Sequence, residues 1–191
     1  MRTSKAAAAE TRKRIVSTAS AEFRRNGIDQ TGLNDLMAAA GLTHGGFYRH
    51  FETKNELVAE AATVALESLL AKLATSANEK GRGNGLGAIA SVYLSPEHRD
   101  HPEVGCLLAA NGSELARADE GIRAAATEGF LRLIDLIAKQ CRVRKDVAER
   151  RAMVAVSTLL GAMMMSRIVT DPALSDTILE QAAKYVAGLD G

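Results

Sequence analysis

The chain has 191 residues, of which 47% are hydrophobic and 25% are charged. This balance is typical of a globular protein and excludes a disordered tail or a collagen-like polymer. Only three prolines, 4% aromatic residues and no tryptophan are present, so alanine and leucine dominate the apolar set. Such a composition favours helices over sheets, and we predict an all-α protein.

No apolar run reaches the roughly 20 residues that a membrane span needs. The first residues lack the hydrophobic segment of a secretory signal. The two cysteines, Cys106 and Cys141, are too few for a disulfide scaffold. These features predict a cytoplasmic protein with no membrane partner.

The net charge of +1 is unevenly distributed along the chain. Residues 1–54 carry a net charge of +4, and the remaining residues carry −3. A basic front on an acidic body is expected when one end of a protein meets nucleic acid.

The N-terminal region has a clear helical pattern. Ile15, Ala19 and Phe23 recur every four residues and form one apolar stripe, and Gly27 is a natural helix stop. Glycines crowd residues 80–87, which we expect to form a hinge or loop, and 95–103 reads as a polar loop. Nine helices are predicted, at about residues 6–26, 32–41, 44–51, 54–79, 86–94, 104–118, 121–141, 146–170 and 175–189.

Two of these helix starts carry recognisable caps. Thr53 and Glu56 form a capping box, in which the two residues satisfy each other's backbone donors, ahead of the long helix over 54–79. Thr43 can cap the short helix over 44–51.

The most informative stretch runs from Thr31 to Lys54. Two helices too short to be stable alone meet at Gly41, which can take a left-handed turn conformation. Gly45 and Gly46 follow at the start of the second helix, although glycine costs about 1 kcal/mol relative to alanine inside a helix. Their missing side chains would let the backbone approach a DNA groove, as a recognition helix must.

Over about residues 10–69 the sequence resembles the tetracycline-repressor (TetR) family of bacterial transcription regulators, although Met37 replaces the family's usual alanine. The resemblance implies an N-terminal helix-turn-helix head over 9–69, with the motif at about 32–51, and a C-terminal effector and dimerisation body over 70–191. It rests on Phe23, Gly27, Thr31, Ala40, Gly41, Leu42, Thr43, Gly45, Phe47, Tyr48, His50, Phe51, Lys54 and Leu57.

The resemblance also implies two classes of DNA contact. Phosphates would be bound by Thr31, Tyr48, His50 and Lys54, the last at a helix N-terminus that favours anions. The major groove would be faced by Thr43, His44, Gly45 and Arg49, with Gly46 on the same exposed side. For Arg12, Lys13 and Arg14, a solvated face and phosphate contact remain equally open.

By the same resemblance, the protein would be a homodimeric repressor that releases a palindromic operator when a small, mostly apolar effector binds. The last two long helices would pair with those of a second copy. Their apolar residues are too many for one covered face, which independently favours an oligomer. These residues are Val154, Val156, Leu159, Leu160, Met163, Met164, Ile168, Ile178, Leu179, Ala182 and Val186.

The helical pattern places a set of candidate effector ligands on inward faces of the body. We expect the pocket to be lined by Tyr93, Leu107, Leu108, Phe130, Ile134 and Met153, with Asn111, Ser113 or Glu114 as polar groups. In a variant of this hypothesis the signal is an oxidant or an electrophile, and it reacts with Cys106, which lies near a helix start whose dipole could lower the pKa of the thiol. A buried structural cysteine is the favoured alternative.

Other classes of function are less well supported by the sequence. The segment 97–103, with Cys106, contains residue types that bind zinc or nickel, but its spacing matches no defined site and favours an interhelical loop. No metal or cofactor is expected, and no catalytic motif of a helical-bundle enzyme is found. An architectural DNA-binding protein without a ligand is the remaining alternative.

Overall fold

The computed structural model describes residues 5–79 and 84–190, and within them it is all-α, as predicted. Residues 80–83 of the expected hinge lie outside the described residues. The elements are α1 Lys5–Asn26, α2 Leu33–Ala39, the 3-10 helix η1 His44–Arg49, α3 Lys54–Glu79, α4 Gly85–Tyr93, α5 Pro96–Asp100, η2 Pro102–Val104, α6 Leu107–Leu115, α7 Glu120–Ala138, α8 Lys145–Ile168, α9 Pro172–Ala187 and η3 Gly188–Asp190.

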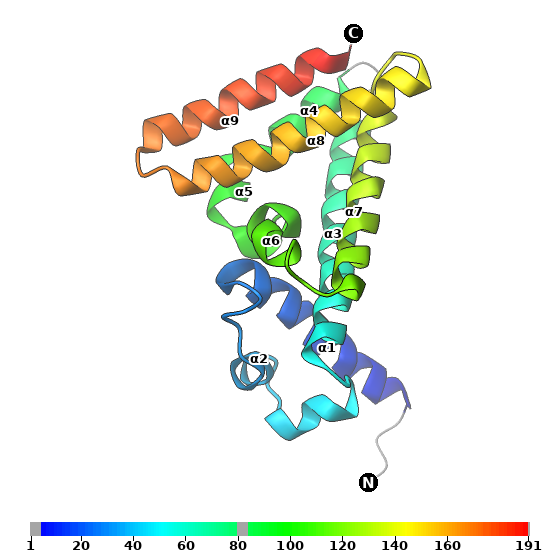
Figure 1. Ribbon diagram of the computed structural model, residues 1–191, viewed down its shortest axis with the longest axis vertical. Coiled ribbons are helices and arrows are strands. Elements are labelled where there is room, and N and C mark those ends of the chain that lie inside the picture. The colour runs from blue at the N-terminus through cyan, green and yellow to red at the C-terminus, as the bar shows by residue number, and fades with distance from the viewer. Residues whose placement is uncertain (1–4, 80–83, 191) are drawn as a thin grey trace.

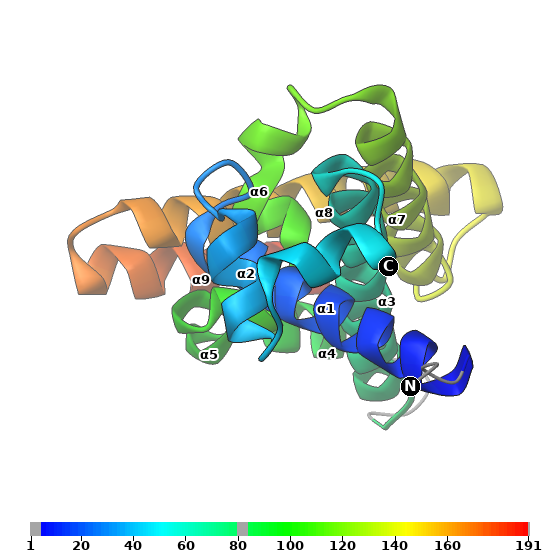
Figure 2. The same cartoon turned by 90° about the horizontal axis from the view of Figure 1, so that it is seen from below.

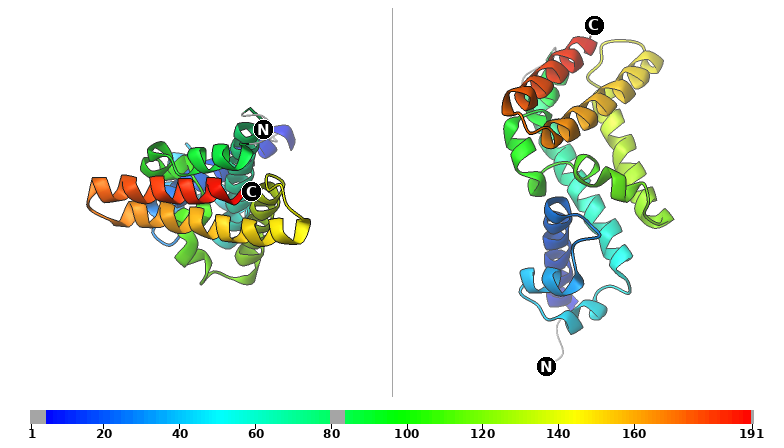
Figure 3. Two further views of the ribbon diagram at one scale, coloured as in Figure 1. Left: turned by 90° about the horizontal axis from the view of Figure 1, so that it is seen from above. Right: turned by 60° about the vertical axis from the view of Figure 1, so that its left-hand side comes forward.

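The helices form two lobes joined by one long helix (Figure 1). We call α1, α2, η1 and the first half of α3 the head, and the remaining helices the body. In the body α7 lies alongside α3, while α8 and α9 form an antiparallel pair at the end opposite the head (Figure 1; Figure 3, left). Seen from below, α1 and α2 lie in front of the body (Figure 2), so the motif region faces away from α8 and α9.

The head core is built on the predicted stripe of α1. Ile15, Ala19 and Phe23 are at most 1% exposed and pack with side chains of α2, η1 and α3. The same cluster also takes in Leu107 of α6 and Ile122 of α7. The head is therefore completed by body helices, which the sequence did not indicate.

The long helix α3 belongs to both lobes. Its residues up to Ala65 pack in the head core, and the body core begins at Leu69. Its first turn carries the predicted cap, with Thr53 Oγ1 accepting from Glu56 N at 3.1 Å. The Glu56 carboxylate accepts instead from Glu52 N at 2.8 Å, one residue before the expected donor.

The expected polar loop over 95–103 contains a short helix, α5, followed by η2. Ser95 caps α5 by accepting from His98 N at 3.1 Å, and Pro96 occupies its first turn, where a missing N–H costs nothing. His98 is buried, with Nδ1 2.6 Å from Tyr93 O and Nε2 accepting from Cys106 N at 2.8 Å. The imidazole thus fixes this segment to the core. The prediction of a polar loop was wrong here because it considered only the polarity of the residues.

Two other predicted helices are shorter than expected. The helix predicted over 104–118 is α6, which spans only Leu107–Leu115 and is interrupted by non-helical angles at Asn111 (φ −121°, ψ 17°). The motif's second helix, η1, is a 3-10 helix that ends at Arg49. Thr43 precedes η1 in an extended conformation, but its side chain makes no capping hydrogen bond.

Helix α8 is the one helix in the described part of the chain that is long and apolar enough, by length and composition, to cross a bilayer. Only 33% of its most apolar window is buried within the chain. It packs against α9, α7, α6 and α5, but Met153, Val154, Met164 and Met165 are exposed, so no element among the described residues covers its other face.

Candidate nucleic-acid interface

The two short helices of the motif meet at a tight turn. Gly41 has φ +68°, the left-handed conformation that the sequence predicted, and Leu42 N donates to Met37 O at 2.8 Å across the turn. Leu36, Met37 and Phe47 are 0% exposed, so both helices are fixed to the head core. Met37 is accommodated at this helix crossing without leaving the core.

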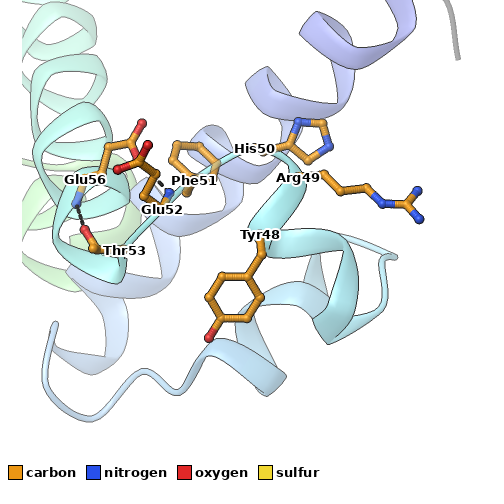
Figure 4. A pocket seen from close by; sticks show the side chains of 7 residues that line it. All are labelled: Tyr48, Arg49, His50, Phe51, Glu52, Thr53 and Glu56. Atoms are coloured by element: carbon orange, nitrogen blue, oxygen red, sulfur yellow. Dashed lines mark hydrogen bonds between the residues drawn. The ribbon is translucent and has the colours of Figure 1, made fainter.

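The outer face of η1 is exposed. Tyr48 is 62% exposed, and its ring packs edge-to-face against Phe47 at 5.2 Å and against His44 at 5.9 Å between centroids. Arg49 is also exposed and projects away from Tyr48 (Figure 4). The buried Phe47 thus anchors a segment whose polar side chains are available to a partner.

The two glycines of η1 have different surroundings. A Cβ atom at Gly45 would meet nothing within 4 Å, so this position leaves open space in front of the backbone. A Cβ atom at Gly46 would lie 3.7 Å from Met37 Cε, toward α2. Gly45 therefore fits the predicted groove contact, whereas Gly46 is half-buried against the first helix of the motif.

A concave site of about 610 Å³ lies between the end of η1 and the start of α3 (Figure 4). Its rim combines possible donors to phosphate with two carboxylates. The lining residues are Tyr48, Arg49, His50, Phe51, Glu52, Thr53 and Glu56.

Arg12 forms an ion pair with one of these carboxylates, that of Glu56, and also binds the residues at the end of η1. Its Nη2 lies 2.9 Å from Glu56 and 2.6 Å from Glu60, and its guanidinium stacks 4.0 Å from the centroid of Phe51. Nη1 donates to the carbonyl oxygen of His50. Burial alone would lower the pKa of Arg12, but its hydrogen bonds to the two glutamates raise it above its usual value.

Neither open interpretation of Arg12, a solvated side chain or a phosphate ligand, matches this geometry. The guanidinium binds groups within the protein and holds η1 against α1 and α3. The spacing of Glu56 and Glu60, four residues apart on one helix face, was the signal that could have revealed it.

Two residues expected to bind phosphate are directed inward instead. Thr31 is 5% exposed, and its hydroxyl donates to Gly27 O at 2.6 Å. Lys54 Nζ donates to Ile28 O at 2.6 Å. Carbonyl oxygens after the end of α1 lack helical partners, and these side chains satisfy them. Both side chains therefore stabilise the α1–α2 connection, and phosphate contact by Thr31 and Lys54 stays a prediction.

The residues predicted to bind the effector do not line one common cavity. Leu108 and Phe130 help line a mostly apolar pocket of about 360 Å³ between α6, α7 and α8, which we call the α6 pocket. Ile134 and Met153 line a separate groove of about 690 Å³ between α7 and α8. Met153 is 50% exposed, not inward, because it lies on the uncovered side of α8.

The other candidates line neither space. Tyr93, Cys106, Leu107 and Asn111 are buried, Glu114 is half-buried and Ser113 is exposed. Cys106 does precede α6, but its complete burial raises the pKa of the thiol, contrary to the dipole argument. Its segment also forms no metal site, since His98 uses both ring nitrogens in hydrogen bonds to the backbone. Within residues 5–79 and 84–190 no group of three or more potential metal ligands is found.

The fold and the exposed motif define a helix-turn-helix DNA-binding protein, and comparison with known proteins specifies its family. Residues 15–61 match "Bacterial regulatory proteins, tetR family". Residues 86–184, more than half of the chain, match "Transcriptional regulator LmrA/YxaF-like, C-terminal domain". The chain belongs to the TetR family of transcription regulators. Membership confirms a DNA-binding regulator rather than an enzyme.

Curated relatives match best over the head. The "Probable acrEF/envCD operon repressor" of Escherichia coli (strain K12) is 45% identical over 56 residues, which are 29% of this chain and 26% of that protein. The chain thus spans about a quarter of the length of the first such relatives. An uncharacterized HTH-type transcriptional regulator of Mycobacterium tuberculosis is 28% identical over 180 residues, 89% of this chain and 91% of that one.

Solved structures match over almost the whole chain. A TetR transcriptional regulator from Chloroflexus aurantiacus superimposes with a TM-score of 0.77 at 27% identity, covering 95% of this chain and 94% of that one. The reduced form of NemR from E. coli has a TM-score of 0.77 at 21% identity, with coverages of 95% and 97%. At that identity the likeness to NemR shows the fold alone.

Proposed function

We propose that this chain is a homodimeric repressor that binds a palindromic operator and releases it when a small, mostly apolar molecule occupies the body. The observation that carries the proposal is the outer face of η1, where His44, Tyr48 and Arg49 are exposed over the buried Phe47. This segment, with Gly45, enters the major groove. The relatives named as repressors support repression as the outcome.

The side chains of the interface divide into two roles. His44 and Thr43 face base edges, so their loss should relax specificity and cost about 1–3 kcal/mol on the preferred operator. Tyr48 and His50 bind phosphates, so their loss should weaken binding to all sequences alike. A large side chain at Gly45 should abolish binding without lowering thermal stability, because the space in front of it serves groove approach.

The exposed apolar surface supports dimerisation. Seven of the eleven exposed large hydrophobic side chains of the described residues lie on α8 and α9, namely Met153, Val154, Met164, Met165, Ile168, Leu174 and Tyr185. Val156, Leu159 and Met163 are instead buried in the chain's own core. A second copy covers the exposed set, and two-fold symmetry then requires inverted half-sites in the operator.

The α6 pocket is the effector site in this proposal. Its lining is mostly apolar, with Arg123 and Thr127 as polar groups, and its volume is at the lower end of the usual range for small-molecule sites. The larger groove at Met153 borders the uncovered side of α8 and is less suited to a ligand that acts on the head.

The proposal is tested by selecting bound DNA from random sequence and measuring affinity for the selected site and for random DNA. Wild type should select an inverted repeat, His44→Ala should lower the ratio of the two affinities, and Tyr48→Ala should lower both affinities. Selection of no sequence, or an unchanged ratio for His44→Ala, contradicts the assignment. If no compound in a metabolite panel releases the DNA, the ligand-independent alternative is favoured.

Dimerisation is tested by sedimentation of Ile168→Glu, with Val104→Glu on η2, at 62% exposure against 63%, as the matched exposed control. The α8 variant should be monomeric and lose operator binding, whereas the control remains dimeric. A wild-type chain that is monomeric at micromolar concentration contradicts the interface.

A further inference from the structure

A set of polar contacts joins α6 of the body to the end of α1 in the head. Asn111 is 2% exposed, and its Nδ2 donates to Phe23 O at 2.9 Å and to Glu114 Oε2 at 2.7 Å. Both acceptors require the amide nitrogen on this side, which fixes the orientation of the amide. The Oδ1 atom has no hydrogen-bond partner among the described residues, so asparagine here carries a desolvation cost.

Glu114 continues the contact to the start of the α1–α2 connection. Its Oε1 accepts from Asp29 N at 2.9 Å, and the carboxylate covers Gly27, whose φ is +91° and where a Cβ atom would lie 3.2 Å from Oε1. Burial raises the pKa of Glu114, but the Asp29 N–H and the Asn111 amide hold it below its usual value. The group is therefore an ionised acceptor that determines the path of the chain from α1 to α2.

The same short helix also forms one wall of the α6 pocket. Leu108, Gly112 and Leu115 of α6 line that pocket, while Asn111 and Glu114 bond the head. In Figure 1, α6 lies between α1 below and α8 above. Because α6 has only nine residues and is already non-helical at Asn111, a group entering the pocket can displace it locally, without bending a long helix.

We propose that Asn111 and Glu114 are positioning residues, which hold the α1–α2 connection in the DNA-binding geometry and release it when the α6 pocket is filled. This inference rests on the proposed function. A hydrogen bond is lost when its partners separate by much less than the width of a side chain, so a small displacement of α6 breaks the bonds to Asp29 N and Phe23 O. Phe23 O then keeps only its helical bond from Gly27 N. An effector therefore binds more tightly to the state in which these hydrogen bonds are broken. This difference in affinity between the two states is what allows the effector to regulate DNA binding.

The first test removes the contact. In Glu114→Gln one side-chain oxygen can still accept from Asp29 N, but the new NH₂ group opposes the Asn111 amide. We expect operator affinity to fall about tenfold, within the usual range of coupling between sites. The dependence on salt should be unchanged, because no phosphate contact is lost. Glu128→Gln, an exposed glutamate of α7, is the matched control and should bind as wild type does.

The second test fills the pocket without requiring a known effector. Gly112 lines the α6 pocket, and a Cβ atom there would meet nothing within 4 Å, so Gly112→Leu places a side chain in the pocket. Gly112→Ala is the control that changes helix propensity but adds little volume. Gly112→Leu should weaken operator binding about tenfold in the wild-type background. In the Glu114→Gln background it should have much less effect, since the contact it breaks is already lost.

The outcomes separate the inference from the proposed function. If wild type selects no operator, the proposed function fails. If wild type binds but Glu114→Gln binds equally well, or if the effects of the two substitutions simply add, the positioning role is wrong. Hydrogen exchange gives an independent readout that needs no substitution in the contact: the Asp29 amide should exchange about tenfold faster in Gly112→Leu than in Gly112→Ala. Equal exchange rates would overturn the proposal.

Discussion

Loss of the Arg12 side chain should destabilise the head and weaken DNA binding without changing its dependence on salt. The guanidinium makes two ion pairs to the first two turns of α3, and one hydrogen bond to a backbone carbonyl and one cation–π contact to the two residues that follow η1. Arg12→Ala removes every one of them and leaves Glu56 and Glu60 without their shared cation.

The magnitude follows from the exposure of these groups. The side chain of Arg12 is 33% exposed and those of Glu56 and Glu60 are 41% and 38% exposed, so both ion pairs are screened by solvent. The pair with Glu60 is worth about 0.2–1 kcal/mol, and the pair with the more exposed Glu56 adds little to it. The stacking on Phe51 adds about 0.5–1 kcal/mol, and the bond to His50 O about 1 kcal/mol. The expected loss of stability is about 2–3 kcal/mol, which in a chain of this length lowers Tm by about 4–12 °C.

The assay combines thermal unfolding with fluorescence anisotropy on the selected operator over a range of salt concentrations. Arg12→Lys is the matched control: it keeps the charge but loses the planar fork and the stack, and should fall between wild type and Arg12→Ala in both measurements. A phosphate ligand would behave differently, because its loss lowers the slope of log K against log [salt] by about one. An unchanged Tm together with that lower slope would refute the positioning role of Arg12.

Three further predictions concern the body. The buried His98 has its pKa lowered to about 4, mainly by burial, whereas the unfolded chain binds this proton near pH 6.5. The free energy of unfolding should therefore fall by about 3 kcal/mol as the pH drops from 6.5 to 4. His98→Gln should flatten that part of the curve of unfolding free energy against pH, whereas the exposed-site control His101→Gln should not. Gly129→Ala would place a Cβ atom 2.2 Å from Leu66 Cδ1 and 3.1 Å from its Cβ. Overpacking of about 1–3 kcal/mol exceeds the gain in helix propensity of about 1 kcal/mol, so calorimetry should show a lower Tm, and an equal or higher Tm contradicts the close α3–α7 packing. The Cys106 thiol, fully buried and with a raised pKa, should react with iodoacetamide only after unfolding, and mass spectrometry that finds rapid labelling of the native protein would restore it as a candidate trigger.

The sequence by itself determined the elements whose signals are local. The apolar stripe of α1, the turn at Gly41 and the cap at Thr53 each depend on residues a few positions apart, so the all-α class and the motif could be predicted from them. The exposure of Tyr48 over a buried Phe47 likewise follows from neighbouring positions on one short helix. The polar stretch after Leu94 also contains a local helix cap, at Ser95. Helix α5 was not predicted from it, because the prediction for this stretch used only the polarity of its residues.

Only the tertiary structure decided the roles of side chains that meet across the sequence. Arg12 contacts residues 38 to 48 positions away, and Glu114 bonds Asp29 over 85 positions, so no periodic pattern could pair them. The inward course of Lys54 depends on carbonyl oxygens left free after α1, and the dispersal of the predicted effector ligands depends on how α6, α7 and α8 pack. Charge and hydrophobicity are properties of single residues, whereas the choice of partner is made by the fold, because a polar group that loses water on burial must bond whichever group the packing brings to it.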